Sequence, residues 1–473
     1  MIYRKFAHSD LMSEEELLQV HQASLEVLEK NGIELAHETA RKILEKNGAR
    51  VEGEKVFIPG KLIEEQLAKA PREFTLHARN PRNNVLIGGD NTALAPGYGA
   101  PFVMDLELGK RRNSTYADYV NFTKLSGASE YIDVVGGVLV EPTDLPDEQR
   151  HAQMYHAAVK YTDKAVMGSA LGEKKARECV EMAAIVHQGI EFVKEHPVLL
   201  SLINTNSPLQ LDRRMMESLL VYAEYKQPMV IASLSMTGTT APVTLAAALV
   251  QQNAEVIACI SIAQLVNPGA PVIYGSASSV VDLKTGGLAI GSPETALMFS
   301  GTAQLARYYK IPSRGGGSLT DSLLPDAQSG YESMFLFMAA VQSGFHFILH
   351  AAGLLENYMT MSYEKFIIDD EICGMVKKYF EGITVDRDHL GVETILHVGS
   401  GGNYLGEDHT FAHMRDMRLP LISSRKAYYS GKIPDTSANA GKYCQELLEQ
   451  YQGPPLDKKI ENELLTYIKG IKK

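Results

Sequence analysis

The chain has 473 residues, of which 45% are hydrophobic and 22% are charged, and its formal net charge is −11. This length predicts a large core, and the acidic balance without a basic patch argues against nucleic-acid binding. No CxxC pair occurs among Cys179, Cys259, Cys373 and Cys444, so we expect neither a disulfide framework nor a cysteine-based zinc site. The start of the chain lacks a signal peptide and no run of about 18 apolar residues stands out, so we expect a cytoplasmic protein without a membrane span.

The first 131 residues are predicted to form a cap of helices and short strands. Ser13 and Glu16 have the spacing of a capping box, and Gly32 follows as a helix stop. Two further amphipathic patterns, over 41–50 and 61–70, predict helices before a β-rich stretch.

From residue 132 onward, short apolar runs alternate with helical patterns, which predicts βα units and a parallel sheet buried on both faces. Eight units favour a (β/α)₈ (TIM) barrel over 132–402, with its active site at the carboxyl ends of the strands. An open doubly wound sheet is the alternative, although no GxGxxG follows the first strand. The helix-rich tail, 403–473, is expected to be a C-terminal extension. The eight runs are 132–142, 164–171, 197–206, 228–236, 271–278, 311–318, 345–353 and 393–402.

Arg314, at a predicted strand end, is a candidate ligand for a carboxylate because its planar guanidinium matches that group. Three glycines, 315–317, follow it and would let a ligand approach the backbone. The alternative remains open that Arg314 pairs with a nearby carboxylate such as Asp321 and that the glycines only form a turn.

His346 and His350 lie four residues apart, so on a strand both would point to the same face. We expect His350, nearer the carboxyl end, to be functional and His346 to be a hydrogen-bonded barrel residue. No third ligand has a familiar metal-binding spacing, so we expect no metal site.

Aromatic residues are placed where they could surround a quaternary ammonium group. Tyr98 and Phe102 lie in a Gly/Pro-rich loop and Tyr274 ends a predicted strand. Each ring face would contribute about 0.5–2 kcal/mol, and ordinary packing is the alternative for any single ring. The sequence has no Walker A, GxSxG or HExxH motif, which favours chemistry in which the protein mainly positions a substrate.

Segments 237–249, 275–297, 315–333 and 403–415 resemble the trimethylamine methyltransferase family, and the similarity covers nearly the whole chain. The resemblance implies a (β/α)₈ barrel that presents a methylated amine to the Co(I) corrinoid of a separate protein, with no cofactor bound permanently. It also implies a homo-oligomer. Founding members carry pyrrolysine and demethylate trimethylamine, whereas every residue here is a standard amino acid. The chain therefore resembles the non-pyrrolysine branch, which acts on quaternary amines.

Within that resemblance, glycine betaine is the expected substrate and dimethylglycine the product, with proline betaine, carnitine and γ-butyrobetaine as alternatives. A quaternary amine leaves as a neutral tertiary amine, so no general acid is required and the partner's cobalt is the nucleophile. We therefore assign no catalytic side chain. Arg314 and His350 are expected to bind the carboxylate. Tyr98, Phe102 and Tyr274 are expected around the methyl groups, Glu356 beside the ammonium, and Thr239, Asp321 and Gln328 as residues that orient the ligand.

Three other functions stay open at this point. A lyase or aldolase would need a Schiff-base lysine or a metal at a strand end. A non-enzymatic subunit would bind a betaine or dock a corrinoid protein without demethylation. Direct methyl transfer to tetrahydrofolate would proceed without any cobalt protein.

Overall fold

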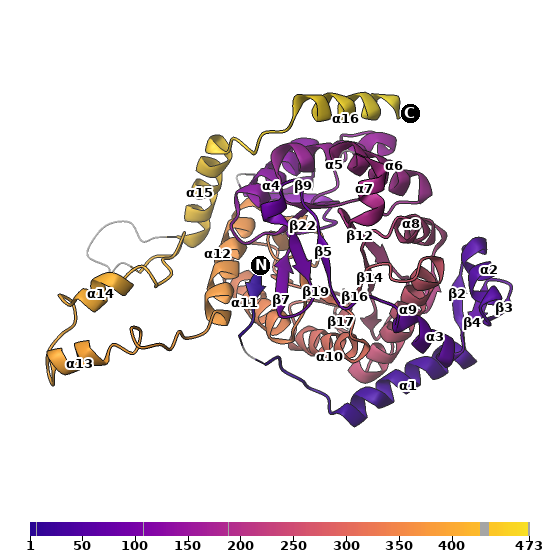
Figure 1. Ribbon diagram of the computed structural model, residues 1–473, viewed down its shortest axis with the longest axis horizontal. Coiled ribbons are helices and arrows are strands. Elements are labelled where there is room, and N and C mark those ends of the chain that lie inside the picture. The colour runs from indigo at the N-terminus through magenta and orange to yellow at the C-terminus, as the bar shows by residue number, and fades with distance from the viewer. Residues whose placement is uncertain (6, 107, 188, 426–434, 472–473) are drawn as a thin grey trace.

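A curled nine-stranded sheet surrounded by helices forms the body of the protein in the computed structural model (Figure 1). The structure describes residues 1–471 except 6, 107, 188 and 426–434. The strand order is β1-β7-β20-β19-β16-β14-β12-β11-β10, and all strands except β1 run parallel to their neighbours. The strands span Ile2–Tyr3 (β1), Asn91–Leu94 (β7), Val134–Gly136 (β10), Ala165–Met167 (β11), Leu199–Asn204 (β12), Met229–Ser233 (β14), Val272–Ser276 (β16), Ser313–Gly316 (β19) and Phe347–Leu349 (β20).

The first seven predicted strand regions each contain one strand of this sheet, but the eighth prediction is wrong. Residues 393–402 include most of a helix, α13 (Val392–Val398), none of whose residues is buried. The remaining parallel strand is β7, which lies in the range expected as an N-terminal cap. The backbone N–H of Asp133, next to β10, donates to the carbonyl of Leu94 in β7 at 2.8 Å, which connects the two ends of the parallel series.

Most helices that cover the sheet start at a residue whose short polar side chain caps the first turn. Asp212, Ser292, Asp326 and Ser362 each accept a hydrogen bond from a backbone N–H in the first turn of the next helix. The covering helices are α4 (Tyr116–Ala128), α5 (Asp147–Tyr161), α6 (Glu173–Val186), α7 (Ile190–Glu195), α8 (Arg213–Glu224), α9 (Leu245–Val266), α10 (Pro293–Tyr309), α11 (Ala327–Gln342) and α12 (Tyr363–Phe380).

Helix α9 is long and apolar enough to cross a membrane by composition, with a mean hydropathy of 1.5 in its most apolar window. However, 78% of that window is buried inside the protein, where α9 packs against α8 and α10 and against three N-terminal helices. Its position in the core therefore explains its apolar composition, because a helix that is buried on all sides must be apolar on all sides.

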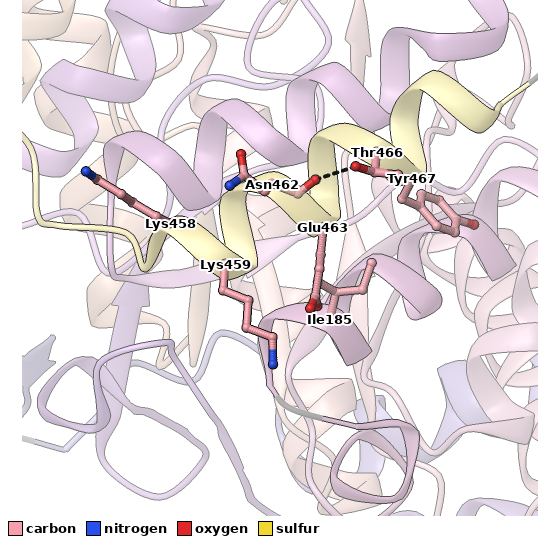
Figure 2. Close-up of a pocket in the computed structure, with 7 residues that line it drawn as sticks. All are labelled: Ile185, Lys458, Lys459, Asn462, Glu463, Thr466 and Tyr467. Carbon is pink, nitrogen blue, oxygen red and sulfur yellow. Dashed lines mark hydrogen bonds between the residues drawn. The ribbon is translucent and has the colours of Figure 1, made fainter.

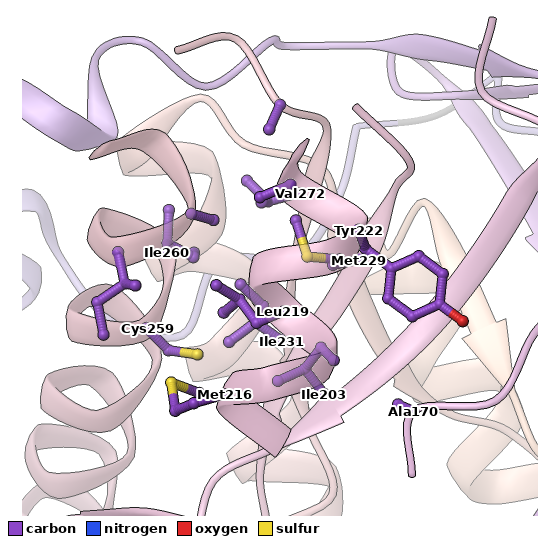
Figure 3. Packing of buried hydrophobic residues seen from close by; sticks show 14 of the residues in the cluster. Ala170, Ile203, Met216, Leu219, Tyr222, Met229, Ile231, Cys259, Ile260 and Val272 are labelled. Carbon is purple, nitrogen blue, oxygen red and sulfur yellow. The ribbon is translucent and has the colours of Figure 1, made fainter. Parts of the chain in front are cut away.

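Alternate residues of the parallel strands pack into two different cores, because successive side chains of a strand point to opposite faces. Between the sheet and the helices, Ile203 and Ile231 meet Leu219 of α8 and Ile260 of α9 (Figure 3). On the inner face, a second core contains residues such as Leu202. Full burial of each such aliphatic side chain contributes about 1.5–3 kcal/mol, so the continuous apolar runs reflect a sheet buried on both faces. The inner core includes Leu200, Leu202, Val230, Ile273, Phe347 and Leu349 and the hairpin of β5 (Phe74–Leu76) and β6 (Val85–Ile87).

The N-terminal helices confirm the sequence predictions with shifted ends. Helix α1 (Glu14–Lys30) begins at the Ser13–Glu16 capping box and is followed by Gly32 at φ +72°. Helices α2 (Glu38–Lys46) and α3 (Gly60–Leu67) match the two further helices. Beside them lies a small sheet of β2 (Ile33–Leu35), β3 (Arg50–Glu52), β4 (Lys55–Phe57) and β13 (Gln210–Leu211).

Two small sheets are built from segments that follow the carboxyl ends of the parallel strands. They rim the face on which the candidate site lies, since parallel strands end on one side of their sheet. One contains β15 (Met236–Thr237), β17 (Ser279–Val281) and β18 (Leu288–Ala289), and the other contains β8 (Phe102–Asp105), β9 (Lys110–Asn113), β21 (Leu354–Leu355) and β22 (Thr360–Met361).

After α12 the chain leaves the body as an extended arm, residues 381–421, which projects away from the other elements in Figure 1. The arm carries α13 and α14 (Asp408–His413), and none of its residues is buried. Helix α15 (Thr436–Gln450) then packs against α12, and α16 (Lys458–Gly470) packs against α5 and α6.

Candidate substrate-binding site

Arg314 presents a buried positive charge at the carboxyl side of the sheet. Strand β19 places it between Gly275 of β16 and Phe347 of β20, and only 1% of the residue is exposed. Its Nη1 donates to the carbonyl of Ser276 at 2.5 Å, whereas Nε has no hydrogen-bond partner. Burial lowers the pKa of Arg314 to about 10, so the guanidinium stays charged at neutral pH.

Among the residues that the structure describes, no carboxylate shifts the pKa of Arg314; the partners that favour its charge are Tyr358 and Tyr98. A buried charge without a counter-ion costs several kcal/mol, and a bound anion would offset that cost. The geometry therefore favours an anionic ligand at this position.

His350 follows β20 and lies close enough to Arg314 for the two to interact electrostatically. Burial, and then the charge of Arg314, hold the pKa of His350 far below its usual value, so the imidazole is neutral at physiological pH. Its Nδ1 is buried without a hydrogen-bond partner. Its φ of +69° is left-handed, a conformation that costs about 1–3 kcal/mol and is often retained at functional sites.

Two further buried polar groups near these side chains lack partners. The Ser318 Oγ is one, and the Ser318 backbone N–H donates to the carbonyl of His350 at 2.9 Å. The Asn357 Oδ1 is the other. Buried polar atoms are nearly always hydrogen-bonded, so unpartnered atoms on adjoining loops are typical of a binding site. Neither residue was selected from the sequence, because unsatisfied hydrogen bonds become visible only in the folded chain.

Two tyrosines contribute rings to this cluster. Tyr98 packs against the inner core, and burial raises its pKa to about 12. A Cβ at Gly137, whose φ is +63°, would lie 2.5 Å from the Tyr98 ring, so only glycine leaves room for it. The Tyr358 ring centroid lies 4.8 Å from that of His350. Tyr358 ends a run of three left-handed residues, 356–358, whose strain again points to a functional loop.

Glu356 and Phe102 both contact a cation of the protein itself, the guanidinium of Arg111. Arg111 Nη1 lies 2.5 Å from Glu356 Oε1, and the Arg111 guanidinium lies 4.4 Å from the centre of the Phe102 ring. Thr360 also donates to Glu356 at 2.6 Å. The expected contacts of Glu356 and Phe102 with a substrate ammonium are therefore replaced by contacts with Arg111.

Tyr274 points away from the inner face, so its expected place beside the methyl groups is wrong. It belongs to the outer core, and its hydroxyl donates to Asn253 Oδ1 of α9 at 2.8 Å. Its neighbour Ile273 belongs to the inner core instead. Position at a strand end suggested a site residue, but the alternation of side chains decides which face a residue serves.

Asp321, Gln328 and Thr239 hold loops together. Asp321 Oδ1 accepts hydrogen bonds from the backbone N–H groups of Ile290 at 2.7 Å and Gly291 at 3.1 Å, so it is not the counter-ion of Arg314. Gln328 donates to Glu332 at 3.0 Å. The exposed Thr239 donates to the carbonyl of Met236 at 3.2 Å. These bonds support the loops around the site.

The glycines after Arg314 are required by packing. A Cβ at Gly315 would lie 2.1 Å from the Phe345 ring, and one at Gly316 would lie 2.4 Å from Leu319. A Cβ at Gly317 would lie 2.8 Å from the Ile348 side chain. The expectation that these glycines admit a ligand is therefore wrong, because protein atoms fill the space.

His346 is a structural histidine, as expected. Its Nδ1 accepts a hydrogen bond from the Ser313 backbone N–H at 3.0 Å, and burial lowers its pKa to about 3.

The four cysteines are not candidates for a methyl-accepting nucleophile. Burial raises the pKa of Cys179 and of Cys444 to about 12, and it raises those of Cys259 and Cys373 as well. Thiols are nucleophilic as thiolates, so these side chains are inert at neutral pH.

A groove of about 720 Å³ runs along α16, away from the strand ends, and Figure 2 shows it. The Thr466 hydroxyl donates to the carbonyl of Asn462 in the same helix at 2.7 Å. None of the lining residues has a buried polar atom without a partner, so the groove lacks the features of the Arg314 cluster. Its lining residues are Ile185, Lys458, Lys459, Asn462, Glu463, Thr466 and Tyr467.

The chain is similar to known methyltransferases of methylated amines. A sequence model described as trimethylamine methyltransferase (MTTB) matches residues 1–473. The chain is 48% identical to a glycine betaine methyltransferase of Desulfitobacterium hafniense, over 97% of this chain and 96% of that protein. It is 30% identical to a proline betaine:corrinoid methyltransferase of Eubacterium limosum, over 99% and 98% of the two chains. The crystal structure of the Methanosarcina barkeri monomethylamine methyltransferase has a similar fold, with a TM-score of 0.56 at 10% identity over 95% of this chain and 90% of that one.

Proposed function

Because the chain belongs to the trimethylamine methyltransferase family, we propose that it transfers a methyl group from glycine betaine to the corrinoid of a separate protein, with dimethylglycine as the product. The observation that carries this proposal is the buried Arg314 guanidinium, which has no carboxylate partner in the described part of the chain and so suits the acid group of a betaine. Other quaternary amines with a carboxylate, such as proline betaine, carnitine and γ-butyrobetaine, are the alternative substrates.

In this proposal Arg314 Nε and His350 Nδ1 bind the substrate carboxylate. Both atoms are buried and without partners, so a ligand replaces hydrogen bonds that the folded chain leaves unmade. A neutral imidazole with its proton on Nδ1 can donate to an oxygen. The rings of Tyr98 and Tyr358, which interact with the Arg314 charge, take the role of the aromatic surround for the methyl groups.

In this reaction the main task of the chain is to position the substrate. The corrinoid, when its carrier protein docks, supplies a Co(I) nucleophile. Loss of a methyl group from a quaternary nitrogen leaves a neutral amine, which needs no proton from the protein. A neutral His350 is therefore compatible with the step. The protonated thiols support an acceptor outside the chain. The residues of the site then act by orienting one methyl group and excluding water.

We further propose that the curled sheet is a closed (β/α)₈ barrel to which the first part, residues 1–131, contributes β7; the boundary expected near residue 402 falls inside the arm. The eight parallel strands and the Asp133–Leu94 hydrogen bond support closure.

The carrier protein would dock over the carboxyl ends of the strands, where exposed apolar side chains favour a protein contact. Loops on that face expose Leu234, Leu283, Leu323 and Leu324, and the first turns of α11 expose Tyr331.

A cytoplasmic homo-oligomer is also part of the proposal. The apolar side chains of the arm support an oligomer, since residues such as Ile383 and Leu405 are 89% and 81% exposed in the single chain.

The test is incubation of the protein with Co(I) cobalamin and a panel of glycine betaine, carnitine, choline and trimethylamine, while methylation of cobalt is followed by its absorption spectrum. We expect glycine betaine to react fastest and choline, which lacks the carboxylate, to react slowly. Faster reaction of choline or trimethylamine would contradict the role of Arg314. Binding of glycine betaine without methylation, even with a reduced corrinoid carrier present, would identify a non-enzymatic binding subunit instead.

A further inference from the structure

We propose that the arm binds a divalent transition metal ion of the zinc class through His389, His413 and Asp416. One ligand atom from each of these residues lies within 4.8 Å of the others. The site lies outside the Arg314 cluster, and the proposal does not rest on the proposed methyl transfer.

The three ligands come from two segments of the arm. His389 precedes α13, whereas His413 ends α14 and Asp416 follows it. The His389 and His413 ring centroids are 4.7 Å apart, and His413 Nδ1 lies 2.7 Å from Asp416 Oδ2. A bound ion would therefore cross-link the segment before α13 to α14.

Further donors surround these ligands. His409 lies four residues before His413 on α14, and their ring centroids are 4.5 Å apart, which is the spacing of paired histidine ligands on one helix face. Asp388 Oδ2 lies 3.3 Å from His413 Nε2. Either residue can supply a fourth ligand by rotation of its side chain. From the sequence we expected no metal site, because no third ligand with a familiar spacing accompanies His346 and His350.

Asp386 orients His389 in the manner of a metal-binding histidine. The His389 Nδ1 lies 2.8 Å from Asp386 Oδ1, which leaves Nε2 available. Histidine ligands commonly donate their other ring N–H to a carboxylate, which fixes the orientation of the ring.

The identity of the donors selects the class of ion. Imidazole and carboxylate ligands suit zinc and similar transition metals, whereas magnesium and calcium prefer oxygen ligands alone. With zinc–ligand bonds of about 2.0–2.1 Å, tetrahedral ligand atoms are roughly 3.3 Å apart. The cluster must contract by about 1–1.5 Å to reach that spacing. His389 and Asp416 are exposed and can rotate without disturbing a core.

The arm has no hydrophobic core of its own within the single chain. None of residues 381–421 is buried, so hydrophobic burial within the chain contributes little to its order. Segments without a core are commonly stabilised by a metal ion, because the free energy of metal binding adds to that of folding.

The experiment uses the full chain without an affinity tag, dialysed against a chelator and then titrated with Zn²⁺ or Co²⁺. Metal content is measured after equilibrium dialysis, and visible absorption of Co²⁺ reports tetrahedral nitrogen and oxygen ligation. The variants are His413→Ala and the milder Asp416→Asn, and the matched control is His397→Ala, an exposed histidine of α13 outside the cluster. Circular dichroism verifies the fold of every variant.

We expect one ion per chain in the wild-type and His397→Ala proteins. Affinity should fall at least about 100-fold in His413→Ala, because loss of a ligand exceeds the 10–100-fold effect of an outer partner. Zn²⁺ should also slow proteolysis within the arm of the wild-type protein and not of His413→Ala. Failure to bind stoichiometric metal, or equal losses in His413→Ala and His397→Ala, would overturn the proposal. Glycine betaine binding should be unchanged in all three variants, so failure of the metal proposal is distinct from failure of the proposed methyl transfer.

Discussion

The Arg314 cluster and the histidine cluster of the arm use similar side chains in opposite surroundings. Arg314 and His350 are buried, lack a carboxylate partner and hold a net positive charge. His389 and His413 are partly exposed and contact aspartates. Burial without a counter-ion favours an anionic ligand, whereas exposed imidazoles among carboxylates favour a cation. The surroundings of a side chain, more than its type, therefore determine which ligand it suits.

The largest expected effect comes from removing the buried positive charge. Arg314→Met keeps much of the side-chain volume but removes every donor. We expect kcat/KM for glycine betaine to fall at least about 100-fold, because truncation of a buried, hydrogen-bonded charge pair costs about 2–5 kcal/mol. Steady-state cobalt methylation measures the effect, and choline serves as the substrate without a carboxylate. Equal losses on both substrates would contradict carboxylate binding by Arg314.

A smaller effect, a loss of affinity for glycine betaine, is expected from substitution of His350. His350→Gln removes the imidazole but can still donate a hydrogen bond, so the Kd for glycine betaine should rise roughly 3–10-fold, equivalent to about 1 kcal/mol. Calorimetric titration measures it. His346→Gln is the matched control, because His346 bonds to Ser313 and does not face the cluster. A greater effect in the control than in His350→Gln would remove His350 from the site.

Substitution of Glu356 tests whether this residue forms only an internal ion pair or also contacts the substrate. Glu356→Gln should change kcat/KM less than about fivefold, since partly exposed ion pairs contribute about 0–1 kcal/mol. Arg111→Met, which removes the partner, should give a similar small change. If Glu356→Gln alone lowers kcat/KM as much as Arg314→Met, Glu356 contacts the ammonium as first expected from the sequence.

The smallest effect is expected from pH. The pKa of Arg314 is lowered only to about 10, so its charge is present below that pH and is lost as the pH rises through it. The pKa of His350 is shifted downward, so it stays neutral as the pH falls toward 6.5. The Kd for glycine betaine should therefore be constant between about pH 6.5 and 8.5, with weakening above about pH 10. An inflection near pH 6.5–7 in calorimetric titrations would show that a histidine titrates in the site.

The sequence predicted much of the fold because the strands are continuous apolar runs with helical patterns between them. It missed β7, a short strand that no helix directly follows, and it mistook α13 for a strand because the apolar residues of the arm resemble a buried run. Arg314 lies in β19 and interacts electrostatically with His350, which follows β20, and their binding of a ligand stays a prediction. The expected place of Tyr274 at the site is wrong, since its face depends on side-chain alternation within the strand.

The unpartnered atoms of Ser318 and Asn357, and the pairing of Glu356 with Arg111, could not be foreseen from the sequence. These features depend on loops that meet only when the sheet curls. Ser318 and His350, for example, are 32 positions apart in the chain yet share a backbone hydrogen bond. Spacing along a sequence carries no information on such contacts.

A crystal structure of the protein soaked with glycine betaine tests the central claim most directly. We expect the carboxylate oxygens to lie about 2.7–2.9 Å from Arg314 Nε, the distance of a charge-assisted hydrogen bond, with the trimethylammonium group toward Tyr98 or Tyr358. A betaine whose ammonium end approaches Arg314, or which binds at another place in the chain, would contradict the claim.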